Sequence, residues 1–123
     1  MLNDSLKSYK ELRVWQKSIA LIKEVYKVTN GFPEDEKFGL IGQMRRSSVS
    51  IPSNIAEGWG RKSLKNYIQF LRNSRGSLFE LETQVVISKE LNYIKYSRTI
   101  ENQIEEISKM LNSLIRSLEK KLQ

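Results

Sequence analysis

The sequence predicts an all-α protein, an antiparallel up-down-up-down four-helix bundle formed by a single domain over residues 1–123. Three observations predict this fold. Apolar residues recur at alternating steps of three and four in four separate segments, which is the period of an α-helix. The whole chain has only two prolines and six glycines, and composition of this kind favours helices. The predicted connections are short, so consecutive helices are expected to run antiparallel.

The first helix is expected over residues 11–29. Its predicted core face consists of Leu12, Trp15, Ile19, Ile22 and Tyr26. Gly31 and Pro33 follow the last of these positions, and this order is typical of a helix C-terminus, because glycine caps a helix and proline cannot continue one. The acidic segment that follows, residues 33–37, is predicted to be a loop.

The second helix is expected over residues 38–58. Its predicted core face consists of Ile41, Met44, Ser48, Ile51 and Ile55. Pro52 lies inside it and lacks an amide hydrogen, so a bend or a restart is expected there. Four serines surround this position: Ser47, Ser48, Ser50 and Ser53. Their hydroxyls can donate to carbonyls one turn back, and their small size allows another helix to approach closely.

The third helix is expected over residues 63–92, with Ser63 as its N-cap. Its core face is predicted to be Leu64, Tyr67, Leu71, Ser74, Leu78, Leu81, Val85 and Ser88. The fourth helix is expected over residues 97–121. It has the most regular pattern in the chain: Ile100, Ile104, Ile107, Leu111, Leu114, Leu118 and Leu122.

Second apolar ridges accompany these faces on three helices. They comprise Val14, Leu21, Val25, Val28, Phe70, Phe79, Val86, Met110 and Ile115. One stripe per helix suffices for an isolated bundle, so extra ridges either widen the core or form contacts between protomers. We therefore predict self-association, with an oligomer interface that includes Val25, Phe70 and Phe79.

Composition excludes several classes of function. The chain contains no cysteine and no histidine, which removes thiolate chemistry, the commonest general base and the commonest transition-metal ligand. The segment Gly58–Ser63 has neither the spacing nor the preceding strand of a phosphate-binding loop. We expect no enzyme activity, no cofactor and no metal site. Apolar runs are only a few residues long, so we also expect no membrane partner and a cytoplasmic location.

The positive charge is concentrated in one block. The chain has a formal net charge of +7, from 21 basic and 14 acidic residues. Residues 37–76 contain eight basic residues against Glu57 alone, which accounts for the whole excess. Localised basic charge favours a polyanionic partner over a merely solvated face.

The start of the third helix is the sharpest candidate site. Arg61, Lys62 and Lys65 lie at a helix N-terminus, where negative charge is normally preferred. A bound phosphate would resolve this conflict by accepting backbone amides and pairing with the cations. Arg72 lies one heptad beyond Lys65 and extends the same face. The predicted nucleic-acid-binding residues are Arg45, Arg46, Arg61, Lys62, Lys65 and Arg72.

Three segments resemble a known family. They read "YKELRVWQKS" from Tyr9, "FPEDEKFGLIGQMRRSSVSIPSNIAEGWGRKS" from Phe32, and "FLRNSRGSLFELETQV" from Phe70. The combination resembles the 23S ribosomal RNA intervening-sequence proteins, with which the accessory protein of diversity-generating retroelements is structurally grouped. The chain departs from the pattern at Asn73, where the family usually has a small apolar residue.

The resemblance implies an up-down four-helix fold, commonly assembled as a homopentamer around a central pore. It also implies a nucleic-acid-binding role without established catalysis. We therefore expect a basic, self-associating bundle that binds RNA or DNA through backbone phosphates with little sequence readout. The alternative is a protein-interaction adaptor or scaffold oligomer, in which the basic block docks an acidic protein surface.

Overall fold

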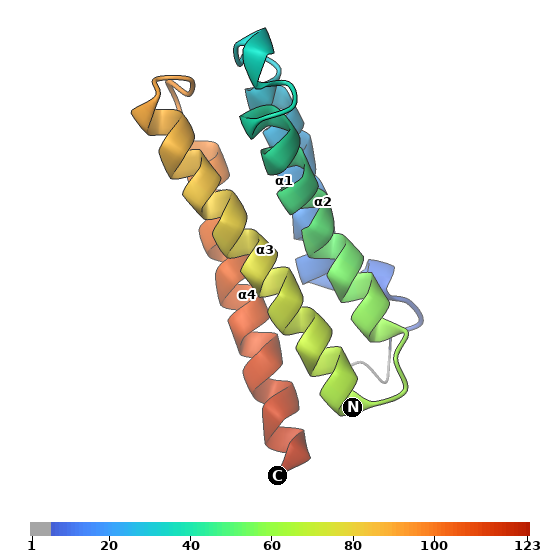
Figure 1. Cartoon of the computed structure of the whole chain (residues 1–123). Helices are drawn as coiled ribbons and strands as arrows, with labels where there is room; N and C mark the ends of the chain where they lie inside the picture. The colour runs from blue at the N-terminus through green and yellow to red at the C-terminus, as the bar shows by residue number, and fades with distance from the viewer. Residues whose placement is uncertain (1–5) are drawn as a thin grey trace.

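A computed structural model describes residues 6–123 and shows an all-helical chain (Figure 1). The four long helices are α1 (Arg13–Thr29), α2 (Leu40–Trp59), α3 (Leu64–Glu90) and α4 (Arg98–Leu122). Two short 3-10 turns, Tyr9–Glu11 and Glu34–Glu36, precede α1 and α2. The predicted fold class, a four-helix bundle, is confirmed, and no helix end differs from the predicted one by more than two residues.

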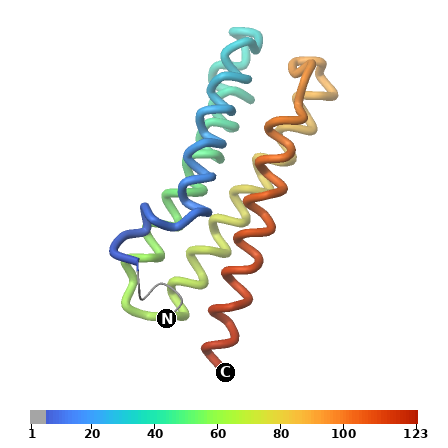
Figure 2. Tube along the Cα trace, turned by 180° about the vertical axis from the view of Figure 1, so that it is seen from behind, coloured from blue at the N-terminus to red at the C-terminus, as the bar shows by residue number. Residues whose placement is uncertain are grey.

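Each helix contacts its neighbours in sequence, and α4 returns to contact α1. The most extensive contact joins α2 and α3. The colour gradient in Figures 1 and 2 shows successive helices running in opposite directions, so that α4 ends at the same end of the bundle as the start of α3. Segments far apart in sequence therefore meet at each end of the bundle.

The core face of α1 differs from the predicted one. Its buried residues are Val14, Ser18, Leu21, Val25 and Thr29. The hydroxyls of Ser18 and Thr29 donate to the carbonyls of Val14 and Val25, both over 2.7 Å. Because these bonds satisfy the hydroxyls, the two polar residues can occupy core positions, and they disguised the true periodicity. The predicted core face instead lies largely at the surface of α1, with Trp15, Ile19 and Ile22 half-buried and Tyr26 exposed, while Leu12 precedes the helix and is buried.

This rotation of α1 corrects one interface prediction. Val25 is completely buried in the core of its own chain, so it cannot contact a second copy and its assignment to the oligomer interface was wrong. Phe79 is 49% exposed, as an interface residue would have to be. Phe70 is half-buried against the end of α2, where Gly58 faces its Cβ. Contacts within the chain thus account for the position of Phe70.

The other predicted core faces are largely confirmed. On α3, every predicted core position except the half-buried Leu64 is buried. On α4, Ile115 takes the core position predicted for Leu114, and Leu122 is exposed. A straight helix drifts relative to a strict seven-residue repeat, so the inward position moves by one residue near the end of α4.

The contact between α2 and α3 combines large apolar residues with several small ones. Pro52 is buried within α2, which continues as one helix from Leu40 to Trp59. Of the two outcomes predicted there, a bend or a restart, the restart does not occur. Ser47, Ser48 and Ser53 donate to carbonyls three or four residues earlier, as predicted. From α3, Ser74 donates to the Ile51 carbonyl over 2.9 Å, and Ser77 donates to the Ser50 hydroxyl over 2.9 Å. These bonds fix the register of the two helices.

Candidate functional site

The six predicted nucleic-acid-binding residues do not form one patch. Arg45 and Arg46 lie in the second turn of α2, whereas Arg61 follows its last residue. Thirteen residues of helix follow Arg46 before α2 ends at Trp59, which corresponds to about 20 Å along the helix axis at 1.5 Å per residue. The basic block of the sequence is therefore divided between opposite ends of the bundle.

Arg45 has a structural role that the sequence did not reveal. Its Nε donates to the Thr29 hydroxyl over 3.0 Å, and its guanidinium lies 4.4 Å from the centroid of the Tyr26 ring. Both contacts join α2 to the end of α1, so Arg45 does not project freely toward a phosphate. Arg46 is exposed, and a Cβ added at Gly42 would come within 3.1 Å of its Nη1. It therefore folds back over the first turns of α2.

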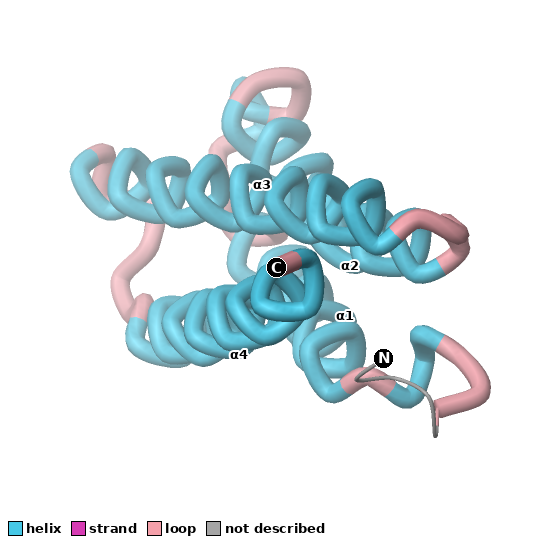
Figure 3. Tube along the Cα trace, turned by 90° about the horizontal axis from the view of Figure 1, so that it is seen from below, coloured by secondary structure: helices cyan, strands magenta, loops and turns pink. Residues whose placement is uncertain are grey.

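The remaining predicted residues gather at the other end of the bundle, together with basic residues that the sequence analysis missed. Arg72 of α3 forms an ion pair with Glu119 of α4, which brings the end of α4 beside the first half of α3. Because Glu119 lies beside Arg72, the neighbouring basic residues of α4 lie at the same end of the bundle as Arg61 and Lys62. These residues are Arg116, Lys120 and Lys121. Figure 3 views the molecule from this end, which we call the basic end and define as residues 6–13, 57–76 and 115–123.

Charge counts show how far this end differs from the rest of the chain. The basic end contains eleven basic residues against Glu11, Glu57 and Glu119. The rest of the sequence contains the other ten basic residues and eleven acidic ones. The basic end therefore has a net charge of +8, and the rest of the sequence has a net charge of −1. The chain is electrostatically polarised along its long axis.

Two of the arginines at the basic end are held by exposed carboxylates. Arg61 lies 2.9 Å from Glu57 and 4.8 Å from the centroid of the Phe70 ring, and Arg72 pairs with Glu119. Exposed ion pairs contribute only about 0–1 kcal/mol, so a phosphate could replace these carboxylates at little cost. Lys62 and Lys65 are exposed and make no ion pair within the part of the chain that the structure describes.

The N-terminus of α3 is capped by its own chain. The Ser63 hydroxyl accepts a hydrogen bond from the Asn66 amide over 3.2 Å, which confirms Ser63 as the N-cap. The cap satisfies one of the amides that we had assigned to an incoming phosphate. Of the first amides, those of Leu64 and Lys65 are left without an acceptor inside the helix. The predicted anion site therefore depends more on the charged side chains of Arg61, Lys62 and Lys65 than on the backbone amides of the helix terminus.

The acidic turn at the opposite end is occupied by structural contacts. The Glu36 carboxylate accepts from the Leu40 amide over 3.2 Å and from the Tyr93 hydroxyl over 2.9 Å. The hydrogen bond to Glu36 raises the pKa of Tyr93 above its usual value. Within residues 6–123, His, Cys, Asp and Glu side chains form no cluster of three or more suited to a metal ion.

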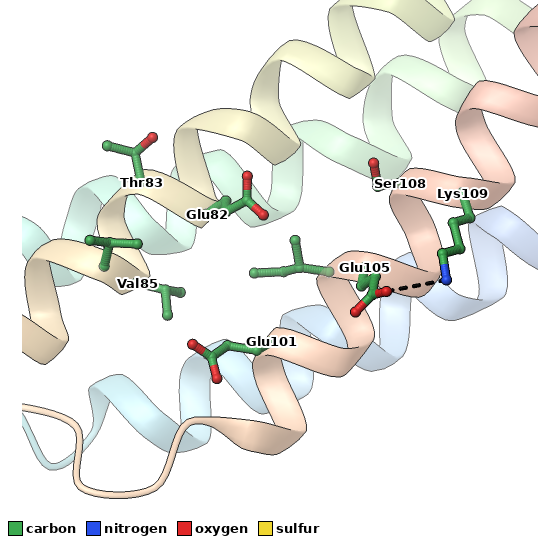
Figure 4. A pocket seen from close by; sticks show the side chains of 9 residues that line it. Glu82, Thr83, Val85, Glu101, Glu105, Ser108 and Lys109 are labelled. Atoms are coloured by element: carbon green, nitrogen blue, oxygen red, sulfur yellow. Dashed lines mark ion pairs between the residues drawn. The ribbon is translucent and has the colours of Figure 1, made fainter.

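A cavity of about 580 Å³ lies between α3 and α4. Figure 4 shows Glu82, Glu101 and Glu105 around it. Lys89 donates to Glu101 over 2.8 Å and lowers the pKa of that carboxyl, while Lys109 lies 3.2 Å from Glu105. A lowered carboxyl pKa is the opposite of what a general acid requires. These contacts do not support a catalytic assignment.

Residues 10–113 match the profile of the 23S rRNA-intervening sequence protein family. The chain belongs to this family. Among solved structures, it is similar to a protein of unknown function from the S23 ribosomal protein family of Bacteroides thetaiotaomicron, with 28% identity and a TM-score of 0.74. That similarity covers 83% of this chain and 97% of the other chain. The search of curated proteins gave no match.

Membership of the 23S rRNA-intervening sequence family agrees with the resemblance predicted from the sequence motifs. Neither comparison points to an enzyme family. Among residues 6–123, none of the helices combines the length and apolar character that a membrane span requires. The basic residues of α4 escaped the sequence analysis because residues 97–123 are nearly neutral as a segment. The only signal in the sequence is that three basic residues, Arg116, Lys120 and Lys121, lie close together near the end of the predicted fourth helix.

Proposed function

We propose that this member of the 23S rRNA-intervening sequence family is a non-enzymatic, self-associating bundle that binds RNA or DNA through backbone phosphates at its basic end. One observation carries the proposal: three segments far apart in sequence bring eleven basic residues together against three acidic ones. Arginine and lysine contacts to phosphates supply most of the sequence-independent affinity of nucleic-acid-binding proteins. We therefore expect little sequence specificity.

Self-association is supported by apolar residues on the outer side of α3. Phe79, Val86, Ile87 and Leu91 are all between about two fifths and just over half exposed. Phe79, Ile87 and Leu91 follow one another at steps of eight and four, so they lie on one side of the helix and form a ridge (the α3 ridge). Val86 lies beside this ridge and lines the cavity between α3 and α4. Family resemblance makes the expected assembly a pentamer, which light scattering at micromolar concentration would test. A ring would repeat the basic end around one rim and multiply its phosphate contacts.

The binding proposal is tested by replacing Arg61, Lys62 and Lys65 with alanine. Each phosphate contact contributes about −0.9 to the slope of log affinity against log salt for duplex DNA, and about −0.7 for single strands. Loss of three contacts should therefore flatten the slope by about two to three per engaged protomer. Arg116, Lys120 and Lys121, changed together to alanine, should flatten it as well, because the structure places them at the same end.

The matched control replaces Lys27, Lys37 and Lys95 with alanine. These lysines are exposed and lie outside the basic end, so the variant loses the same charge and should keep nearly the same salt slope. Equal effects of all three variants would show that only net charge matters, and the basic end would not be a site. An adaptor that docks an acidic protein would bind no nucleic acid in any of these titrations.

A further inference from the structure

A small polar cavity lies between α2 and α3, away from the basic end. Its volume is about 230 Å³, and it is lined by Gln43, Arg46, Ser47, Ser50, Glu80 and Gln84. These residues come from two of the segments that carry the family resemblance, and the proposed nucleic-acid binding assigns a role to none of them but Arg46. A wider groove of about 430 Å³ adjoins the cavity and adds Phe79 and Ile87 to its wall.

Two hydrogen-bond acceptors at this cavity have no partner within the described chain. Gln84 is only 9% exposed, and its Oε1 is buried without a hydrogen bond. The Glu80 carboxylate is exposed and makes no ion pair or hydrogen bond among residues 6–123. Buried polar atoms are nearly always satisfied in native proteins, so a donor is missing. Two acceptors, one of them charged, favour a cationic donor such as an ammonium or guanidinium group. Arg46 also lines the cavity, but it forms no ion pair with Glu80 among the described residues.

The surroundings of the cavity favour a protein donor over a free ion. Phe79 and Ile87 at the adjoining groove are 49% and 42% exposed and belong to the α3 ridge. A cation delivered by an apolar surface would cover this ridge and satisfy the acceptors in one contact, which is the usual anatomy of an interface core with charged groups at its edge.

The chain itself carries a surface of this kind on α1. This surface consists of the half-buried Ile19 and Ile22 and the exposed Tyr26. Lys23 lies on the same side of the helix, four residues after Ile19 and three before Tyr26. Lys23 is exposed and makes no ion pair within the described residues. This surface and the α2–α3 cavity lie on different faces of the bundle, because α1 and α3 do not contact each other among residues 6–123.

The two surfaces also lie at similar heights along the bundle. Contacts between side chains set the register: Thr29 of α1 meets Arg45 of α2, Ser50 of α2 meets Ser77 of α3, and Met44 meets Ser88. Counting along the helices from these contacts places Glu80 level with Tyr26 and within about one helical turn of Lys23. A ring whose axis runs along the bundle keeps each contact at one height, and two different faces of the same chain meet in such a head-to-tail ring.

We propose that Lys23 of a second copy of this chain occupies the Glu80–Gln84 cavity, while Ile19, Ile22 and Tyr26 of that copy cover the α3 ridge. The proposal rests on the self-association proposed above and adds to it the residues that meet. The ammonium group pairs with Glu80 and donates to the side-chain oxygen of Gln84, whose terminal torsion belongs to the class with a broad range of angles. Each protomer then gives one lysine and receives one.

Charge reversal tests this contact. Lys23→Glu and Glu80→Lys should each raise the dissociation constant of the assembly by at least about tenfold, because like charges then face each other. The double variant, with both changes, should recover most of the wild-type mass in sedimentation velocity and light scattering. Both positions are exposed, so circular dichroism should show unchanged helix content.

Glu82→Lys is the matched control. It makes the same charge change on α3, but Glu82 lines the cavity on the α4 side, so assembly should persist. A monomeric wild type would overturn both self-association and this contact. A wild-type multimer that both single reversals leave intact would overturn the contact alone. Dissociation by both single variants without recovery in the double variant would also overturn the pairing of Lys23 with Glu80.

Discussion

The two sides of α3 make opposite kinds of contact. Toward α2 it presents Ser74 and Ser77, which donate hydrogen bonds to a backbone carbonyl and to the hydroxyl of Ser50. The buried residues of α4 are instead all aliphatic: Ile100, Ile104, Ile107, Leu111, Ile115 and Leu118. Ion pairs between α3 and α4, Arg72–Glu119 and Lys89–Glu101, lie at exposed margins.

This comparison shows what holds each pair of helices together. Small residues let α2 and α3 approach closely. Their contact therefore requires that these side chains stay small and that a few hydrogen bonds keep their direction. The α4 contact depends on the amount of apolar surface removed from water, which is not directional. Added volume should therefore harm the first contact, and removed volume should harm the second.

The largest expected effect comes from removing volume on the α4 side. Leu111 is completely buried, so Leu111→Ala should lower the free energy of unfolding by about 2–5 kcal/mol through lost burial and the cavity left behind. Urea denaturation at fixed protein concentration measures it. Leu122→Ala is the control, because Leu122 is exposed and its loss should cost less than about 0.5 kcal/mol. Equal costs for the two variants would contradict the assignment of Leu111 to the core.

The next effect comes from adding volume on the α2 side. A Cβ at Gly58 would lie 2.7 Å from the Phe70 Cβ and 3.2 Å from the Tyr67 carbonyl oxygen. Overpacking of this kind costs about 1–3 kcal/mol, so Gly58→Ala should destabilise the fold although alanine is the better helix former.

Gly76→Ala provides the matched control on α3. A Cβ there would meet nothing within 4 Å, so the substitution should stabilise the protein by about 0.5–1 kcal/mol through helix propensity alone. Thermal unfolding of both variants gives the comparison. The same sign of change at Gly58 and Gly76 would show that α2 and α3 are less tightly packed than the structure indicates.

A smaller effect is expected from deleting one hydroxyl between α2 and α3. Ser74→Ala removes the donor to the Ile51 carbonyl in a fully buried place, and the loss should be about 1 kcal/mol. Ser113→Ala is a suitable comparison, because Ser113 is exposed on α4. Its stability in urea should stay within about 0.5 kcal/mol of wild type. An unchanged Ser74→Ala variant would mean that packing alone sets the register of α2 and α3.

The smallest effect concerns the exposed margin between α3 and α4. Lys89 lowers the pKa of Glu101, so Lys89→Ala should return this pKa toward the ordinary carboxyl value, which NMR titration can follow. A carboxyl with a lowered pKa adds stability above its unfolded pKa and loses it as the pH falls through the folded value. The difference in stability between wild type and variant should thus be small near neutral pH and vanish in acid. An unchanged Glu101 pKa in the variant would show that Lys89 does not pair with Glu101 in solution.

Much of the fold could be predicted because α3 and α4 bury side chains that are plainly apolar or regularly spaced. The prediction failed on α1, where Ser18 and Thr29 occupy the core and Tyr26 does not. A helix with two apolar ridges has two possible inward faces, and the choice depends on which face its neighbours can cover. The hydroxyls of Ser18 and Thr29 donate hydrogen bonds within α1, which allows the face that carries them to be buried. A hydropathy pattern does not show whether a polar side chain will find such a partner.

The candidate site was predicted in part. Arg61, Lys62, Lys65 and Arg72 meet at one end of the bundle, as local sequence and the position of a helix start indicate. The contacts of Arg45 within the chain could not be predicted, because its partners Thr29 and Tyr26 lie on another helix. Basic residues of α4 were overlooked, because the charge of a segment does not show which segment it will lie beside.

The sequence by itself determined the four helices, the sign of the net charge and the family, since each depends on the order of residues along the chain. Tertiary structure alone decided which ridge of α1 faces inward and which basic residues share a surface. The physical reason is that helix formation responds to neighbours within one turn, whereas burial and electrostatic potential respond to everything nearby in space. An antiparallel return of α4 places Lys120 and Lys121 near residues some fifty positions earlier in the chain, and only folding creates that proximity.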